Sequence, residues 1–183
     1  MNKLSRLTRN SLIIAFFFLI DKILAFVRTG IISRQYSDSV HLLDTFNAAN
    51  NLPDVLFALI SGGALAMAFI PLLTEYLTTK DRAAAWDLFS RVANVAFLVT
   101  GSFAILIAIF AQPIVDAKLG IAPGFDQEQR TLLAELMRLN LIGTIIFSIS
   151  GLVMASLQAN QHFIFPAMAP SMYNIGQIFG AIF

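Results

Sequence analysis

The sequence predicts an all-α fold, a polytopic bundle of membrane-spanning helices. Hydrophobic residues make up 57% of the 183 positions and charged residues only 13%, whereas about a quarter of an ordinary soluble domain is charged. There are 17 phenylalanines and the mean hydropathy is +0.76. The alternative is a soluble helical bundle with a large core, but residues 92–109 lack the amphipathic alternation that such a bundle requires.

The composition also excludes several classes of function. The chain has no cysteine, hence no disulfide framework and no thiolate metal site. A net charge of +1 gives no basis for a nucleic-acid-binding surface. There is no phosphate-binding P-loop and no nucleophile elbow, and the two histidines, His41 and His162, lack metal-ligand spacing. We therefore expect no enzyme, no metal site and no cofactor.

Long apolar runs separated by short polar breaks predict five spans, at 11–33, 42–77, 92–111, 131–157 and 163–183. The first apolar run is too long for a signal peptide and has no A-x-A-like cleavage site, so we expect it to be retained. The fifth span stops at Phe183 inside an apolar run. We therefore expect residues 1–183 to be a partial N-terminal transmembrane lobe of a longer protein.

The first span contains three ionisable residues, Asp21, Lys22 and Arg28. Asp21 and Arg28 are seven positions apart and lie on nearly the same face of a helix, whereas Lys22 points elsewhere. Snorkelling of Arg28 towards the interface, or charge balance between Asp21 and Lys22, would be a purely structural explanation. Three ionisable residues in one span favour a functional one, because charges in a bilayer are expensive.

The second span has a polar stripe. On a helix with 100° per residue, four of its side chains fall within about 80° of one another: Asp44, Asn47, Asn51 and Asp54. Hydrocarbon cannot solvate such a stripe, so it must face a water-filled cavity or other protein. The pattern indicates a cavity-lining helix of a transporter.

Proline and glycine also interrupt this second span. Pro53 removes a helical hydrogen bond and the Gly62–Gly63 pair loosens the backbone, so we expect a kink that is either a hinge or static. In the fourth span, polar residues follow one side and either line a cavity or join helices by hydrogen bonds: Asn140, Thr144 and Ser148. The polar side of the fifth span carries Ser171, Asn174 and Gln177.

The basic residues predict the orientation. Six lie before the first span or between the second and third, namely Lys3, Arg6, Arg9, Lys80, Arg82 and Arg91. The opposite loops hold three, namely Arg34, Lys118 and Arg130. The positive-inside rule therefore predicts a cytoplasmic N-terminus. Within the spans, Lys22 and Arg28 could hold an anionic head group, and Asp44 and Asp54 could pair with them or change protonation or ion occupancy.

Several motifs follow one another along the chain: KILAFVRTGIISRQY at 22–36, LLDTFNAANNLPD at 42–54, GALAMAFIPLLTEY at 63–76, APGF at 122–125 and FPAMAPSMYNIG at 165–176. In this order they resemble the N-terminal signature of the MurJ/MviN lipid II flippases, a family of the MOP exporter superfamily. The resemblance covers essentially the whole chain. Arg28 matches the first-span arginine of that family, and Lys22 stands where many members have another arginine.

The resemblance implies roughly fourteen helices in two lobes around a central cavity that works by alternating access. Such a protein moves an undecaprenyl-pyrophosphoryl-linked peptidoglycan precursor from the cytoplasmic to the outer leaflet of the bacterial plasma membrane. The expected partners are this lipid-linked pyrophosphate, membrane lipids, and a coupling ion or the membrane potential. The expected substrate-binding set is Arg28, Lys22, Asp44, Asn47, Asn51, Asp54 and Asn174.

The chain departs from the family pattern at four positions. Thr29 stands where many members have an aspartate, Phe57 and Ala58 where many have arginines, and Gly62 where some have an acidic residue. Two alternatives therefore stay open. One is another MOP exporter, for a different lipid-linked oligosaccharide or for cation-coupled drug efflux; the other is a structural or partner-binding membrane subunit whose polar stripe merely joins helices.

Overall fold

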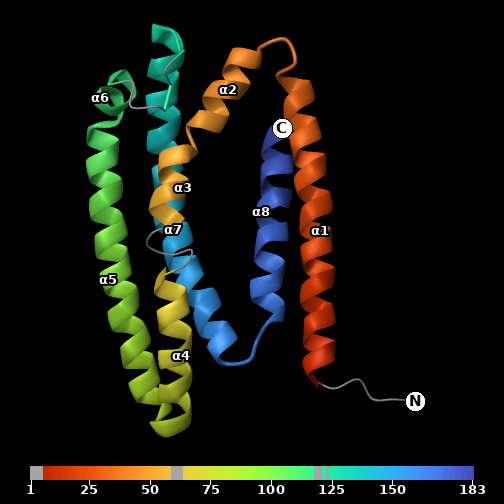
Figure 1. Ribbon diagram of the computed structural model, residues 1–183, viewed down its shortest axis with the longest axis vertical. Coiled ribbons are helices and arrows are strands. Elements are labelled where there is room, and N and C mark those ends of the chain that lie inside the picture. Colours follow the sequence, from red (N-terminus) through yellow and green to blue (C-terminus); the bar gives the residue numbers. More distant parts are fainter. Residues whose placement is uncertain (1–5, 59–63, 118–120, 123) are drawn as a thin grey trace. The chain divides into compact units, whose positions relative to one another are not determined.

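The computed structural model describes residues 6–58, 64–117, 121–122 and 124–183. The all-α prediction is confirmed, because these residues form eight helices and no strand (Figure 1). The helices are α1 (Arg6–Gln35), α2 (Val40–Ala48), α3 (Asn51–Phe57), α4 (Ala64–Thr79), α5 (Arg82–Ile109), α6 (Ala111–Asp116), α7 (Gln127–Ala159) and α8 (Ile164–Ile182). Lys3, Lys118 and the expected Gly62–Gly63 hinge lie outside the described residues.

The chain divides into two compact units. In the first unit, α1 packs against α8, and the two helices run in the same direction (Figure 1). Gln161, with φ 63°, makes a left-handed turn shortly before α8 begins. The buried residues of α8 are Ser171 and Asn174, and Asp21 of α1 is also buried. Polar side chains therefore occupy the buried positions of this helix pair.

The second unit is built around α7, which contacts α2, α3, α4, α5 and α6. Eight of its nine buried positions recur every three or four residues along one side of the helix: Leu133, Met137, Leu141, Thr144, Ser148, Leu152, Ala155 and Ala159. Alanine supplies nine of the seventeen buried hydrophobic residues that the described chain contains. Small side chains let helix backbones approach closely, as in membrane bundles.

The segment expected as one span over 42–77 forms three helices, α2, α3 and α4, in the described residues. The break between α2 and α3 has a local cause at Pro53. Proline has no N–H to donate to the carbonyl of Ala49, four residues earlier, so the helix is interrupted there. The Nδ2 of Asn50 donates to the carbonyl oxygen of Phe46 at 3.1 Å, which satisfies a carbonyl near the end of α2.

Two expected loops are shorter in the structure, because much of each is helical. Between 78 and 91, α4 continues to Thr79 and α5 begins at Arg82, where the Asp81 carboxylate accepts a hydrogen bond of 2.7 Å from the Ala84 N–H. Between 112 and 130 lie α6 and the start of α7. There Asp126 and Gln129 form a reciprocal capping box, with bonds of 2.8 and 3.2 Å.

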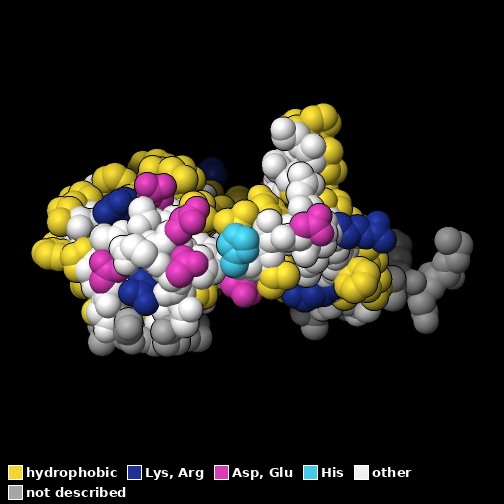
Figure 2. Space-filling model, turned by 90° about the horizontal axis from the view of Figure 1, so that it is seen from above, with side chains coloured by type: hydrophobic (Ala, Val, Ile, Leu, Met, Phe, Trp, Pro, Cys, Tyr) yellow, Lys and Arg dark blue, Asp and Glu magenta, His cyan; other side chains and the backbone are white. Residues whose placement is uncertain are grey.

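Two of the described helices are long and apolar enough to cross a membrane, α5 with a mean hydropathy of 2.3 and α7 with 1.8. Large apolar side chains on α5 are exposed, among them Leu98, Ile105 and Ile109. Figure 2 looks onto the end of the second unit where α6 lies: acidic and basic side chains gather on this end, and hydrophobic side chains cover its flanks. Such a distribution suits apolar flanks in lipid and charged ends in water.

Candidate functional site

The charged face of α1 meets the polar side of α8 in the first unit. Asp21 and Arg28 lie two helical turns apart on the same side of α1, as their spacing predicts. On α8, Asn174 and Gln177 are three residues apart and likewise share a side. Asp21 is bonded to Asn174 and Arg28 to Gln177, so that two polar contacts connect the helices.

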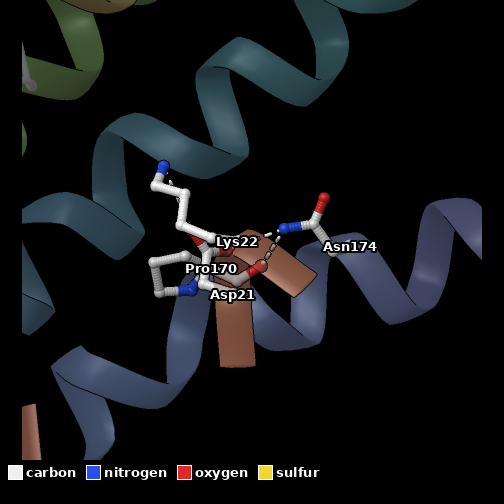
Figure 3. A network of polar contacts seen from close by, with 4 residues as sticks. All are labelled: Asp21, Lys22, Pro170 and Asn174. Atoms are coloured by element: carbon white, nitrogen blue, oxygen red, sulfur yellow. Dashed lines mark hydrogen bonds and ion pairs between the residues drawn. The ribbon is translucent and has the colours of Figure 1, made fainter. Parts of the chain in front are cut away.

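The first contact joins a buried carboxylate to a buried amide. Asp21 is 7% exposed and Asn174 is 5% exposed. The Asn174 Nδ2 donates to the Asp21 Oδ1 at 2.7 Å and lies 3.3 Å from the Pro170 carbonyl oxygen (Figure 3). The Lys22 Nζ lies 3.6 Å from the other carboxylate oxygen, Oδ2. Asp21 is therefore hydrogen-bonded to α8 and balances the charge of Lys22.

The second contact is a chain of two short hydrogen bonds. The Arg28 Nη1 donates to the Gln177 Oε1 at 2.6 Å, and the Gln177 Nε2 donates to the Tyr173 Oη at 2.6 Å. Arg28 and Gln177 are both half-buried. Among the residues that the structure describes, no carboxylate forms an ion pair with Arg28. The guanidinium is thus held by a neutral amide and keeps its net positive charge.

The residues of the predicted polar stripe lie in the second unit. Asp44 and Asn47 are on α2, Asn51 and Asp54 are on α3, and all four side chains are exposed. The buried residues of α2 and α3 are Thr45 on one helix and Pro53 and Leu56 on the other. The stripe residues therefore point away from the packed side of their helices. Of the seven expected site residues, the first unit holds Lys22, Arg28 and Asn174, and the second holds these four.

The polar residues of α7 serve packing within the second unit. The Asn140 Nδ2 donates to the Asn50 Oδ1 at 3.0 Å, which ties α7 to the break between α2 and α3. Thr144 and Ser148 are buried, and their hydroxyls donate to carbonyls of their own helix at 3.0 and 2.9 Å. Asn140 thus joins two helices, as one of the two explanations expected, whereas the hydrogen bonds of Thr144 and Ser148 stay within α7.

Three contributors to the site were absent from the set expected from the sequence: Asp21, Tyr173 and Gln177. The spacing of Asp21 and Arg28 and the polar side of α8 were both visible in the sequence. The missing signal was the partnership of the two helices, because Arg28 and Gln177 are 149 positions apart. Periodicity shows which face of a helix is polar and says nothing about which distant helix it meets.

Comparison with known proteins gives a consistent result. The sequence model of the family "Lipid II flippase MurJ" matches residues 39–183. A probable lipid II flippase MurJ of Buchnera aphidicola subsp. Acyrthosiphon pisum is 30% identical over 167 residues, which is 90% of this chain and 32% of that protein.

Two further relatives agree. The lipid II flippase MurJ of Burkholderia cenocepacia is 25% identical over 179 residues, 97% of this chain and 34% of its own length. A probable lipid II flippase MurJ of Vibrio cholerae is 31% identical over 116 residues, 63% of this chain and 22% of its own length. The chain spans about a third of the length of the curated relatives that it matches over most of its residues.

Proposed function

The chain belongs to the lipid II flippase MurJ family, and from this premise we propose that it forms part of a protein that moves lipid II across the bacterial plasma membrane. We further propose that Arg28 contacts the pyrophosphate of this lipid. Family membership and two long apolar helices place the protein in a membrane. The observation that carries the assignment of Arg28 is its half-buried guanidinium, which bonds a neutral amide and meets no carboxylate among the described residues.

The two cations of α1 take different parts in this proposal. Lys22 lies 3.6 Å from the Asp21 carboxylate, so part of its attraction for a second anion is already used. Arg28 uses one N–H on Gln177, and a guanidinium has five donors in a planar fork that matches phosphate oxygens. Arg28 is therefore the primary head-group contact, and Lys22 contributes a weaker, longer-range attraction.

The exposed stripe on α2 and α3 supplies the acidic and amide groups of the proposed pathway. Asp44 and Asp54 would pair with cations or change their charge state as the protein alternates between inward-open and outward-open forms, driven by a coupling ion or by the membrane potential. Asn47 and Asn51 would contact the polar parts of the substrate. The excess of basic residues near the N-terminus and around the start of α5 supports a cytoplasmic N-terminus.

The test is substitution of Arg28 in the complete protein, produced in cells depleted of their own lipid II flippase. Arg28→Gln removes the charge and the fork of donors, so flipping should fall by roughly ten- to a hundredfold, the value of one hydrogen bond to a charged group. Arg28→Lys should fall less, because it keeps the charge. Lipid II reaching the outer leaflet is measured against the amount of protein in the membrane.

Arg91→Gln is the matched control. This substitution removes the same charge, but the Arg91 side chain is exposed and its Nε is paired with the Asp87 Oδ2 at 2.8 Å. It should support flipping at the wild-type rate. Normal flipping by both Arg28→Gln and Asp44→Asn, at unaltered protein level, would remove the proposed roles of these residues.

A further inference from the structure

We propose that Gln177 is a positioning residue, which holds the Arg28 guanidinium ready for an anionic head group without neutralising it, while Tyr173 anchors the other end of its amide. The inference rests on the proposed contact between Arg28 and a lipid-linked pyrophosphate. It adds two residues of α8 to a site that family motifs assign to α1, and it gives each a distinct task.

The direction of the hydrogen bonds determines these tasks. A glutamine amide has a donating and an accepting end, and only the accepting oxygen can bond Arg28, because a guanidinium donates and cannot accept. Gln177 Oε1 accepts from Arg28 Nη1 at 2.6 Å, which leaves Nε2 to donate to the Tyr173 Oη, also at 2.6 Å. A tyrosine hydroxyl can donate or accept, so Tyr173 does not select this orientation but anchors the Nε2 end of the side chain once Arg28 has set it. The order of the side chains therefore runs from Tyr173 through Gln177 to Arg28.

The neutral acceptor has a clear consequence for an anionic ligand. An arginine side chain has many rotamers, and ordering it on binding lowers affinity. Gln177 removes part of that cost in advance, because Arg28 is already held between two helices. A carboxylate at this position would also hold Arg28, but it would cancel the charge that attracts the ligand.

The same helix pair also contains a cation that is balanced by a carboxylate. Asp21 receives a hydrogen bond from Asn174 on α8 and lies 3.6 Å from Lys22. The α1–α8 contact thus has two levels. At the first the Asp21 carboxylate balances Lys22, and at the second the neutral amide of Gln177 holds Arg28. Among the described residues this second level leaves Arg28 with an uncompensated charge, which is the property required of an anion contact.

The experiment is a double-mutant cycle on binding of undecaprenyl pyrophosphate to the complete protein, in nanodiscs of phosphatidylethanolamine and phosphatidylglycerol. Gln177→Met keeps the shape and removes the acceptor, and should weaken binding about fivefold, because the Arg28 side chain is then ordered only when the ligand binds. Gln177→Glu should weaken binding further, because it neutralises Arg28. Tyr173→Phe should give a smaller loss, because Gln177 keeps its bond to Arg28 and loses only the anchor at its Nε2 end.

The cycle separates positioning from a general structural role. In an Arg28→Gln background, Gln177→Met and Tyr173→Phe should change affinity by less than about twofold, because their effect acts through Arg28. Gln127→Glu, which adds the same charge at the exposed start of α7, is the control and should bind as the wild type does. Thermal unfolding of each variant shows whether it is folded, and if Gln177→Glu is not, the other two variants carry the test.

The failures of the two proposals are distinguishable. Wild-type affinity in Arg28→Gln would overturn the proposed role of Arg28. Loss of binding in Arg28→Gln with wild-type affinity in Gln177→Met would overturn only the positioning role. Equal losses for Gln177→Met with and without Arg28 would also overturn it, and equal affinities for Gln177→Met and Gln177→Glu would overturn the claim that neutrality matters.

Discussion

Asp21 and Arg28 share one side of α1, yet they meet α8 in different ways. Asp21 is 7% exposed, and its carboxylate is satisfied by an amide N–H and a neighbouring ammonium. Arg28 is half-buried and bonds a neutral amide oxygen. A buried charge is tolerated where partners compensate its desolvation. We therefore assign Asp21 to holding α1 and α8 together and keep Arg28 as the proposed contact with substrate.

The assignment of Asp21 predicts a loss of stability when its carboxylate is removed. Asp21→Leu leaves the buried Nδ2 of Asn174 without its acceptor on α1 and Lys22 without its counter-charge, which should cost about 1–3 kcal/mol. Asp21→Asn keeps an acceptor oxygen and should cost less. The measurement is unfolding of the purified complete protein in detergent, followed by temperature or denaturant.

Asp87→Asn is a suitable control for this experiment. Asp87 is also paired with a cation, since the Arg91 Nε lies 2.8 Å from its Oδ2, but both side chains are more than half exposed. Exposed pairs of this kind contribute about 0–1 kcal/mol. If Asp21→Leu unfolds at the same temperature as Asp87→Asn, then Asp21 does not hold the two helices together.

At the scale of the helices, local chemistry decides where α3 and α7 begin. Pro53 accounts for the break between α2 and α3, and the Asp126–Gln129 capping box marks the start of α7. Both signals are in the sequence, but the apolar pattern runs across Pro53 and the polar residues around Asp126 resemble a loop. Hydropathy finds apolar runs, whereas helix ends depend on single hydrogen bonds.

The N-cap of α5 offers a test at this scale. The Asp81 carboxylate accepts from the Ala84 N–H at 2.7 Å. Asp81→Ala should reduce stability by about 1 kcal/mol and speed hydrogen exchange in the first turn of α5, because that N–H loses its partner. Asp81→Asn keeps a capping oxygen and should exchange at nearly the wild-type rate. Identical exchange in the alanine and asparagine variants would show that the cap has no such role.

At the scale of the whole molecule, the proposed orientation predicts which turns can be labelled from outside. The chain has no cysteine, so a single introduced thiol gives an unambiguous signal. Ser37→Cys, in the exposed turn after α1, should react with a membrane-impermeant maleimide in intact cells. Thr79→Cys, at the exposed end of α4, should react only after permeabilisation. The reverse pattern would place the N-terminus outside the cell.

The sequence by itself determined the helical class, the family and the face on which each charge of α1 lies. These follow from composition, from ordered motifs and from the 3.6-residue period, all of which are local properties of the chain. The tertiary structure alone decided the partners. It paired Asp21 with Asn174 and Arg28 with Gln177, across 153 and 149 positions. It also placed the polar stripe on the exposed side of α2 and α3. The physical reason is that periodicity orients a side chain around its own helix axis, whereas the packing of helices distant in sequence determines which group that side chain meets.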